Sequence, residues 1–382
     1  MLTPDPHAPV EPPASPVPVP RQRIAAHNGA PVWGGAEIAV SRLLAGLGRR
    51  GHDVTFFVAR DHVARRAEAF GLHTEPLRVG GDGALHHALR VARALRRHRS
   101  QVLIVGTFRK LLHLAAGARW AGVPVVARIG LEGDEPRSAK YRFLFRNWVD
   151  RVVVSSRSMR QAYLDAMPDL EGRVVQIAKG VGAPEPGAPR EAVRESLGVA
   201  PDAVVVTALA RLVPDKRIER FVDVVAALPP GAVGLVAGDG PLRTELEAHA
   251  RARGGRVRFL GHVDRVGDLL GASDLVLVTS RRESMSNAML EAMAAGVPVV
   301  STPVDGACEV LTPSPGDPAP GVVTDTFEVE SIVAAADPLV RDGVLREAMG
   351  VAAARRAREQ FGEEAMLDGW ERLLQEVAAG GG

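Results

Sequence analysis

The sequence lacks the features of secreted and membrane-spanning proteins. Only one of its 382 residues, Cys308, is a cysteine, so no disulfide can form within the chain. No uninterrupted apolar run is long enough to cross a bilayer. The N-terminus has no basic segment followed by an apolar core, which a secretory signal requires. We therefore expect a cytoplasmic protein.

Aromatic residues are scarce too, at 4% of the chain, and charge is unevenly divided. Few aromatic side chains can stack on bases, and no nucleic-acid-binding motif is present, so we expect no nucleic-acid partner. Residues 1–180 hold 27 Lys and Arg against 15 Asp and Glu (+12); the remainder holds 20 against 30 (−10). The basic half would attract an anionic membrane surface or a phosphorylated glycan. The alternative is that its charge only aids solubility.

The chain is long enough for two domains of ordinary size. Residues 1–20 contain eight prolines, a composition typical of a disordered tail. Beyond them, short apolar strands alternate with amphipathic helices, which predicts an α/β protein with two doubly wound, Rossmann-like domains. The Gly- and Pro-rich segment 180–190 separates them. We predict domains over residues 21–182 and 183–358, and a C-terminal helix over 359–382.

Residues 281–302 (RRESMSNAMLEAMAAGVPVVST) contain two glutamates separated by seven residues. They follow a predicted buried strand, 274–279, and include a helix that ends at Gly296. Glu283 is placed in the loop at the carboxyl end of this strand, where open α/β sheets bind ligands. Glu291 lies within the helix, where its carboxylate either points to water or accepts hydrogen bonds from sugar hydroxyls. For both residues, a solvated glutamate is the alternative.

Cations and glycines follow other predicted strands. Arg211 and Lys216 come after strand 203–209, next to a helix start, and their charges suit a diphosphate. Two surface cations are the alternative. Glycines that allow the backbone to approach a phosphate or nucleotide precede helices at Gly34, Gly35, Gly238 and Gly240. Tight strand-to-helix turns would use the same glycines.

Together these elements resemble those of the retaining glycosyltransferases of family 4 (group 1 glycosyl transferases), which have the two-domain GT-B architecture. The resemblance implies a cleft between the domains and a last helix that crosses back onto the first. It implies that Glu283 contacts the donor sugar and Glu291 the nucleotide ribose. Arg211 and Lys216 would hold the donor diphosphate and stabilise the departing nucleotide. The backbone at Ser284, Met285, Ser286 and Asn287 would approach the diphosphate.

The activity implied is metal-independent, retaining transfer of a sugar from a nucleoside-diphosphate sugar to a hydroxyl of a glycan or lipid-linked acceptor, in envelope polysaccharide or glycolipid synthesis. No cofactor and no metal site are expected, since Arg211 and Lys216 supply the positive charge and no metal-binding aspartate pair accompanies them. The enzyme would be peripheral on the inner face of the plasma membrane. The alternatives are a sugar-nucleotide epimerase, a phosphorylase of the same architecture and an inactive scaffold.

The acceptor side departs from the family pattern. Relatives commonly have a histidine just before the glycine of the loop that reads RIGLEGDE here, and this chain has Ile129 at that position. No histidine role can therefore be transferred. Arg128, Glu132 and Asp134 follow a predicted strand and are the expected acceptor-side residues. A structural salt bridge would also explain them.

Overall fold

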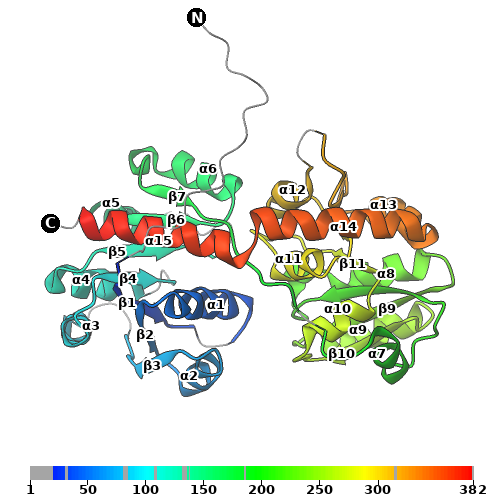
Figure 1. Cartoon of the computed structure of the whole chain (residues 1–382), viewed down its shortest axis with the longest axis horizontal. Helices are drawn as coiled ribbons and strands as arrows, with labels where there is room; N and C mark the ends of the chain where they lie inside the picture. Colours follow the sequence, from blue (N-terminus) through cyan, green and yellow to red (C-terminus); the bar gives the residue numbers. More distant parts are fainter. Residues whose placement is uncertain are drawn as a thin grey trace, which may run out of the picture.

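A computed structural model describes residues 20–30, 33–80, 85–106, 110–130, 136, 138–184, 186–313 and 316–380. Figure 1 shows two α/β lobes side by side. The first lobe holds a seven-stranded parallel sheet in the order β3-β2-β1-β4-β5-β6-β7, and the second holds a six-stranded parallel sheet in the order β10-β9-β8-β11-β12-β13. The predicted fold of two doubly wound domains is confirmed. In each sheet the strand order reverses beside the first strand, and such switch points bind ligands.

In the first lobe, helices cover both faces of the sheet. Its strands are β1 (Arg23–Asn28), β2 (Asp53–Val58), β3 (His73–Pro76), β4 (Val102–Val105), β5 (Val125–Arg128), β6 (Arg151–Val154) and β7 (Val174–Gln176). Its helical segments are α1 (Gly35–Arg49), α2 (Asp61–Glu68), α3 (Leu85–Arg97), α4 (Leu111–Ala121), α5 (Ala139–Trp148), α6 (Arg157–Ala166) and the 3-10 turn η2 (Pro168–Leu170). Helices α3 to α6 pack on one face of the sheet, and α1 and α2 pack on the other.

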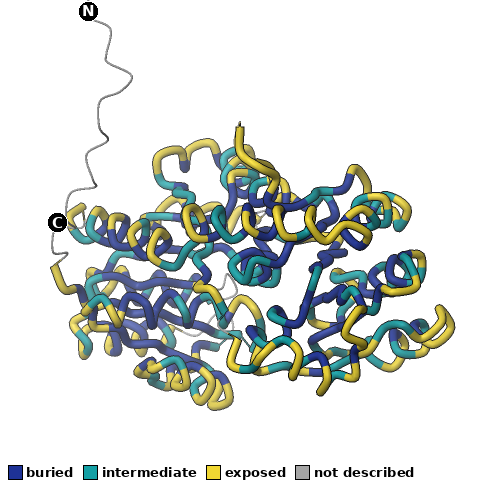
Figure 2. Tube along the Cα trace, turned by 45° about the vertical axis from the view of Figure 1, so that its right-hand side comes forward, coloured by how far each residue is buried: buried dark blue, intermediate teal, exposed yellow. Residues whose placement is uncertain are grey.

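The second lobe repeats this plan. Its strands are β8 (Val204–Leu209), β9 (Ala232–Ala237), β10 (Val257–Gly261), β11 (Leu275–Val278), β12 (Val299–Ser301) and β13 (Gly321–Val323). Its helical segments are α7 (Arg190–Ser196), η3 (Pro214–Lys216), α8 (Ile218–Ala227), α9 (Arg243–Ala252), α10 (Val266–Ala272), α11 (Asn287–Ala294), α12 (Asp305–Leu311), α13 (Val329–Arg341) and α14 (Gly343–Gln360). The tube in Figure 2 is mostly buried along the strands and exposed on the outer helices. No helix in the described part of the chain is long and apolar enough to span a membrane.

The last helix, α15 (Glu363–Ala379), returns to the first lobe as predicted (Figure 1). Its buried face, which includes Trp370 and Leu374, completes the core on the side of the sheet covered by α1. Gly46 of α1 lets α15 approach closely, because a Cβ there would lie 2.7 Å from the Leu367 side chain. An ion pair also joins α1 to α15: the guanidinium of Arg50, which follows α1, lies 2.8 Å from the carboxylate of Glu371 on α15. The chain therefore crosses between the lobes twice.

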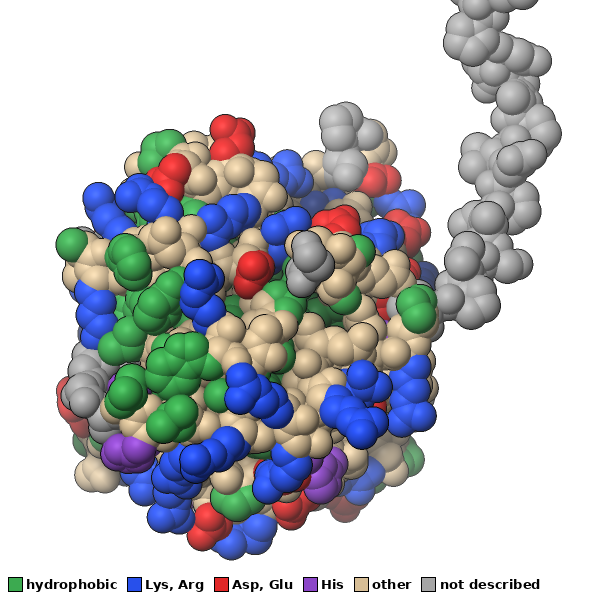
Figure 3. Space-filling view, turned by 90° about the vertical axis from the view of Figure 1, so that its left-hand side faces the viewer, with side chains coloured by type: hydrophobic (Ala, Val, Ile, Leu, Met, Phe, Trp, Pro, Cys, Tyr) green, Lys and Arg blue, Asp and Glu red, His purple; other side chains and the backbone are tan. Residues whose placement is uncertain are grey.

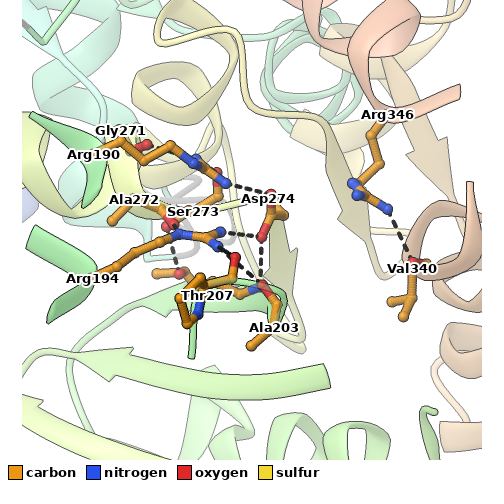
Figure 4. Close-up of polar contacts among 12 residues, drawn as sticks. Arg190, Arg194, Ala203, Thr207, Gly271, Ala272, Ser273, Asp274, Val340 and Arg346 are labelled. Carbon is orange, nitrogen blue, oxygen red and sulfur yellow. Dashed lines mark hydrogen bonds and ion pairs between the residues drawn. The ribbon is translucent and has the colours of Figure 1, made fainter. Parts of the chain in front are cut away.

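A buried ion network fixes the start of the second lobe (Figure 4). Asp274, just before β11, accepts hydrogen bonds from Arg190 at 2.6 Å and Arg194 at 2.5 Å, both on α7. The backbone N–H of Val205 also donates to Asp274, at 2.7 Å. Arg194, whose side chain is 9% exposed, additionally donates to the carbonyl of Ala203 at 3.1 Å. The network thus joins the helix that follows the interdomain segment to the centre of the sheet.

We predict that removing Asp274 from this network lowers the free energy of unfolding more than removing an aspartate from an exposed ion pair. Asp274→Ala leaves the buried Arg194 guanidinium without its carboxylate, so we expect a loss of about 3–5 kcal/mol in the free energy of unfolding. Urea unfolding followed by far-UV circular dichroism measures this loss. The control is Asp317→Ala, which removes an exposed ion pair with Arg355 and should cost less than about 1 kcal/mol. Equal losses in the two variants would contradict the assignment of Asp274 as a structural anchor.

Candidate active site

One pocket, of about 380 Å³, lies between the lobes at the carboxyl ends of strands from both sheets. It brings together most of the residues that the sequence analysis singled out: Gly34, Gly35, Arg128, Arg211, Lys216, Gly238, Glu283, Ser284, Met285, Ser286, Asn287 and Glu291. Gly240 is described by the structure but does not line this pocket. Glu132 and Asp134 lie outside the described residues.

The two loops at the switch point of the second sheet are bound to each other. The loop after β11 donates the Arg281 N–H to the Asp215 carbonyl at 2.8 Å. Thr279 Oγ1 donates to the Lys216 and Arg217 carbonyls, at 3.1 Å each. These contacts place the Lys216 ammonium against the Glu283 carboxylate, which also accepts a hydrogen bond from Ser280 Oγ at 3.1 Å. The predicted cation and the predicted glutamate therefore form one unit.

Two helix N-termini face the pocket from opposite lobes. Helix α1 begins after Gly34 and helix α11 after Ser286, and neither residue caps its helix through a side chain. The first N–H groups of each helix carry partial positive charge and favour an anion. Asn287 Nδ2 donates to the Gly35 carbonyl at 3.1 Å and joins the two helix starts. The pocket thus offers backbone donors as well as side-chain cations.

Glu291 has a partner on the first lobe. Its carboxylate, on a side chain that is 13% exposed, lies 2.7 Å from the Arg42 guanidinium of α1. Around it, Met289 and Met293 are fully buried in the core of the second lobe. Glu291 therefore points to the pocket from a helix whose opposite side is apolar.

The two glycines after β9 differ in their surroundings. Gly238 lines the pocket and has a φ of +137°, and a Cβ at this position would lie 1.9 Å from the Ala210 carbonyl oxygen. A Cβ at Gly240 would lie 2.5 Å from the Leu212 carbonyl oxygen. Both positions therefore exclude a side chain because of the neighbouring backbone of the β8 loop. Only Gly238 also exposes its backbone to the pocket.

Three titratable residues that line the pocket, Glu37, Lys179 and His262, were not among the site residues predicted from the sequence. Lys179 follows β7 and donates to the Met285 carbonyl across the lobes, at 2.5 Å. Burial and the nearby Arg128 and Lys216 lower the pKa of Lys179 to about 8, while Glu283 acts in the opposite direction. In the sequence, Lys179 lies between an apolar strand and Gly180, at the start of the Gly- and Pro-rich segment 180–190, and this position at the end of a strand could have indicated a site residue.

Of the three residues predicted for the acceptor side, Arg128 is the one that the structure describes. It ends β5 and lines the pocket from the first lobe. Burial lowers the pKa of its guanidinium to about 10, although the Glu37 carboxylate opposes this shift. The backbone of Arg128 pairs with β6, and its guanidinium forms no hydrogen bond or ion pair with a side chain in the described part of the chain; Glu37 acts on its charge from further away. The carboxylates of the alternative structural salt bridge, those of Glu132 and Asp134, lie outside the described residues, so this alternative stays open.

The lobes are also bound beside the pocket. Ser284 Oγ donates to the Gly130 carbonyl at 3.0 Å. Glu309, on α12, accepts hydrogen bonds from the Arg157 N–H at 2.7 Å and from Gln176 Nε2 at 2.5 Å. The Ser284 contact holds the loop after β11 against the first lobe, and the Glu309 contacts hold α12 against it.

Two doubly wound lobes with a pocket between their switch-point loops, and a last helix that returns to the first lobe, constitute the GT-B architecture of glycosyltransferases. The family model described as glycosyl transferases group 1 matches residues 189–356. The model described as Glycosyltransferase Family 4 matches residues 33–182. The chain belongs to the group 1 glycosyl transferases of family 4 and is a glycosyltransferase.

Individual relatives are similar over part of their length. The chain is 30% identical over 249 residues to the lipopolysaccharide core biosynthesis glycosyltransferase LpsE of Rhizobium meliloti (strain 1021), covering 65% of this chain and 69% of that enzyme. It is 34% identical over 172 residues to the N-acetyl-alpha-D-glucosaminyl L-malate synthase of Bacillus anthracis, covering 42% and 43%. The crystal structure of Anabaena HepE in complex with UDP-glucose has the same fold, with a TM-score of 0.81 and 22% identity over 94% of this chain and 100% of that one.

The lowered pKa of Lys179 predicts how stability depends on pH. From about pH 8 to the ordinary lysine pKa of 10.5, the unfolded chain binds more protons at this residue than the folded chain. The free energy of unfolding should therefore gain up to about 3 kcal/mol from Lys179 across this range. In Lys179→Met this gain should disappear.

Urea unfolding of the wild type and Lys179→Met at several pH values between about 7 and about 10 measures the difference. Lys140→Met, at an exposed position, is the control for removing a lysine. The same pH dependence in the wild type and in Lys179→Met would contradict the placement of a charged Lys179 in this pocket.

Proposed function

We propose that the pocket transfers a sugar from a nucleoside-diphosphate sugar to an acceptor hydroxyl, with retention of the anomeric configuration and without a metal ion. The observation that carries this proposal is the unit formed by Lys216 and Glu283 beside Arg211 and the uncapped N-terminus of α11. This arrangement combines positively charged groups that can bind a diphosphate with a carboxylate that can accept hydrogen bonds from sugar hydroxyls. The complex of the structurally similar HepE with UDP-glucose supports a donor of this class.

In the proposed complex, the diphosphate lies between Arg211, Lys216 and the first N–H groups of α11. Positive charge at this position stabilises the negative charge that develops on the leaving diphosphate. Glu283 accepts hydrogen bonds from the sugar, and Glu291 accepts them from the ribose in exchange for part of its contact with Arg42. Gly34 and Gly35 close the pocket from the first lobe.

The proposed reaction exchanges two bonds at the anomeric carbon. The bond to the diphosphate oxygen breaks, and its electron pair leaves with the nucleoside diphosphate. The acceptor oxygen forms the new bond on the same face, and its proton passes to the departing phosphate oxygen. Arg211, Lys216 and α11 supply the electrostatic stabilisation that a metal ion supplies in other transferases.

The acceptor is proposed to be a glycan or a lipid-linked molecule of the cell envelope. The name of the LpsE relative, which refers to lipopolysaccharide core biosynthesis, supports this class. Arg128, from the lobe opposite the diphosphate groups, is the described residue proposed to meet the acceptor.

Turnover tests the proposed function. We expect Glu283→Ala and Lys216→Ala to lower acceptor-dependent release of nucleoside diphosphate by at least about 100-fold, since each removes a charge aimed at the reacting groups. Donors that differ in base and sugar are first ranked by the rise they cause in the thermal unfolding midpoint, because a ligand that binds only the folded state stabilises it. Acceptor-dependent release by the wild type would exclude an inactive scaffold.

Glu330→Ala, at an exposed position on α13, is the matched control and should keep the wild-type rate. All variants must show the wild-type circular dichroism spectrum. Added EDTA should not lower the rate, and NMR of the product should show the anomeric configuration of the donor. Wild-type rates in both Glu283→Ala and Lys216→Ala would rule out the proposed site.

We also propose that the first lobe meets an anionic membrane surface through α3, α4 and α5. Figure 3 shows hydrophobic side chains gathered on one face of the molecule, with Lys and Arg around them. Leu85, Leu89, Trp120 and Phe143 are between 40% and 67% exposed on these helices. Exposed arginines of the same helices surround them: Arg90, Arg93, Arg119 and Arg142. Apolar side chains within a basic rim suit a surface of anionic lipid headgroups.

Vesicle binding tests this surface. The double variant Leu85→Ser/Phe143→Ser should bind vesicles rich in phosphatidylglycerol at least about tenfold more weakly than the wild type, because two apolar contacts with the lipid are lost. Co-sedimentation measures the binding. The control Val344→Ser/Val351→Ser changes two exposed apolar residues of α14 and should bind as the wild type does. Equal binding to neutral vesicles, or no difference between the two double variants, would contradict the proposal.

A further inference from the structure

We infer that Arg128 and Lys179 form an anion-binding subsite that recognises a carboxylate or phosphate group on the acceptor. The inference rests on the proposed function, because it gives the acceptor a charge and a place in the same pocket. Both residues line the pocket from the first lobe, at the ends of the strands β5 and β7 or just beyond them. They therefore face the second lobe, where the groups proposed for the diphosphate lie.

Each glutamate of the pocket has a hydrogen-bond or ion-pair partner, whereas among the described residues the Arg128 guanidinium has only the more distant attraction of Glu37. Glu291 pairs with Arg42, Glu283 pairs with Lys216, and Glu37 accepts a hydrogen bond from Asn28 at 3.4 Å. A half-buried guanidinium without a partner destabilises the folded chain. Among the described residues, Arg128 and Lys179 lie together in the pocket and repel each other, and an anionic group of a ligand would balance both charges.

The two cations are complementary in chemistry. A guanidinium is planar and can bind both oxygens of a carboxylate or phosphate at once. Lys179 adds a charge whose position is fixed by its hydrogen bond to the Met285 carbonyl. That bond uses one of its three N–H donors, so two donors remain for an anion. Arg128 and Lys179 can therefore attract one anionic group by their charge and orient it by directed hydrogen bonds.

The diphosphate is already supplied with positive charge from the other lobe. Arg211, Lys216 and the N-terminus of α11 all belong to the second lobe. The Glu283 carboxylate, held by Lys216, also faces Lys179. An anion that extended from Lys216 to Lys179 would approach this carboxylate and be repelled. A separate anion on the first-lobe side avoids that repulsion, and this is the side proposed for the acceptor.

Binding of simple anions tests the subsite. We would titrate L-malate and inorganic phosphate into the wild type, with and without a saturating nucleoside diphosphate, at about pH 7 where Lys179 is mostly protonated. Sodium chloride at matched ionic strength corrects for screening. Isothermal titration should show binding of malate or phosphate in both series. Arg128→Gln and Lys179→Met should weaken it by about 10- to 100-fold, since a hydrogen bond to a charged group is lost.

Arg251→Gln, at an exposed position on α9, is the matched control and should bind the anions as the wild type does. The inference is overturned if the wild type binds neither anion, if Arg128→Gln binds the anions as tightly as the wild type, or if the anions compete with the nucleoside diphosphate, which would assign the cations to the diphosphate. A loss in Arg128→Gln of a preference for UDP-glucuronate over UDP-glucose would move the anion to the donor sugar and overturn the acceptor assignment. If no nucleoside diphosphate binds, the proposed donor site fails, while the series without nucleotide still tests the subsite.

Discussion

The contact between Lys216 and Glu283 determines how the second lobe presents its charges. Each residue lies in a loop that leaves one of the two central strands, β8 and β11, and backbone contacts from Thr279 and Arg281 hold the loops together. Without the carboxylate, Lys216 would bring an unbalanced positive charge to the side of the pocket that already holds Arg211. With it, a cation can be held in position for a diphosphate while its charge is balanced. The loops therefore depend on each other both for their conformation and for their charge.

The first lobe completes the site by bringing a second helix N-terminus and two more cations to the same pocket. This requires that the lobes be held in register, and contacts from both do so. Asn287 and Ser284 reach the backbone of the first lobe, and Glu309 accepts hydrogen bonds from it. On the far side, α15 carries Trp370 into the first core. Polar contacts near the pocket can exchange partners with a ligand, whereas the apolar contacts of α15 cannot, so the packing of α15 on the first lobe does not depend on a bound ligand.

Much of the fold could be predicted from sequence because buried parallel strands are short apolar runs, as in residues 275–278. Strand β3, with the sequence HTEP, has no such run because it lies at a sheet edge and is partly exposed; β13, with three residues, is too short to stand out. Glu283, Lys216 and Gly34 could be selected because they follow strands at the switch points. The partner of Glu291 could not be predicted, because Arg42 lies on an amphipathic helix and nothing in the sequence distinguishes it from the other arginine of that helix, Arg49. Lys179 was not predicted as a site residue, because it directly precedes the Gly- and Pro-rich segment that was interpreted as the connection between the domains.

Charged side chains are paired differently on the two sides of the pocket. On the second lobe, Lys216 and the two glutamates are paired. A ligand there must replace these protein partners, so each new contact contributes little net binding free energy. On the first lobe, Arg128 is half-buried and without a partner among the described residues, and burial lowers its pKa and that of Lys179. An unpaired charge of this kind costs folding free energy in the absence of ligand, and that free energy is regained when an anion binds. If the acceptor binds on the first lobe as proposed, its recognition should depend strongly on its charge, which would select between acceptors that are otherwise similar.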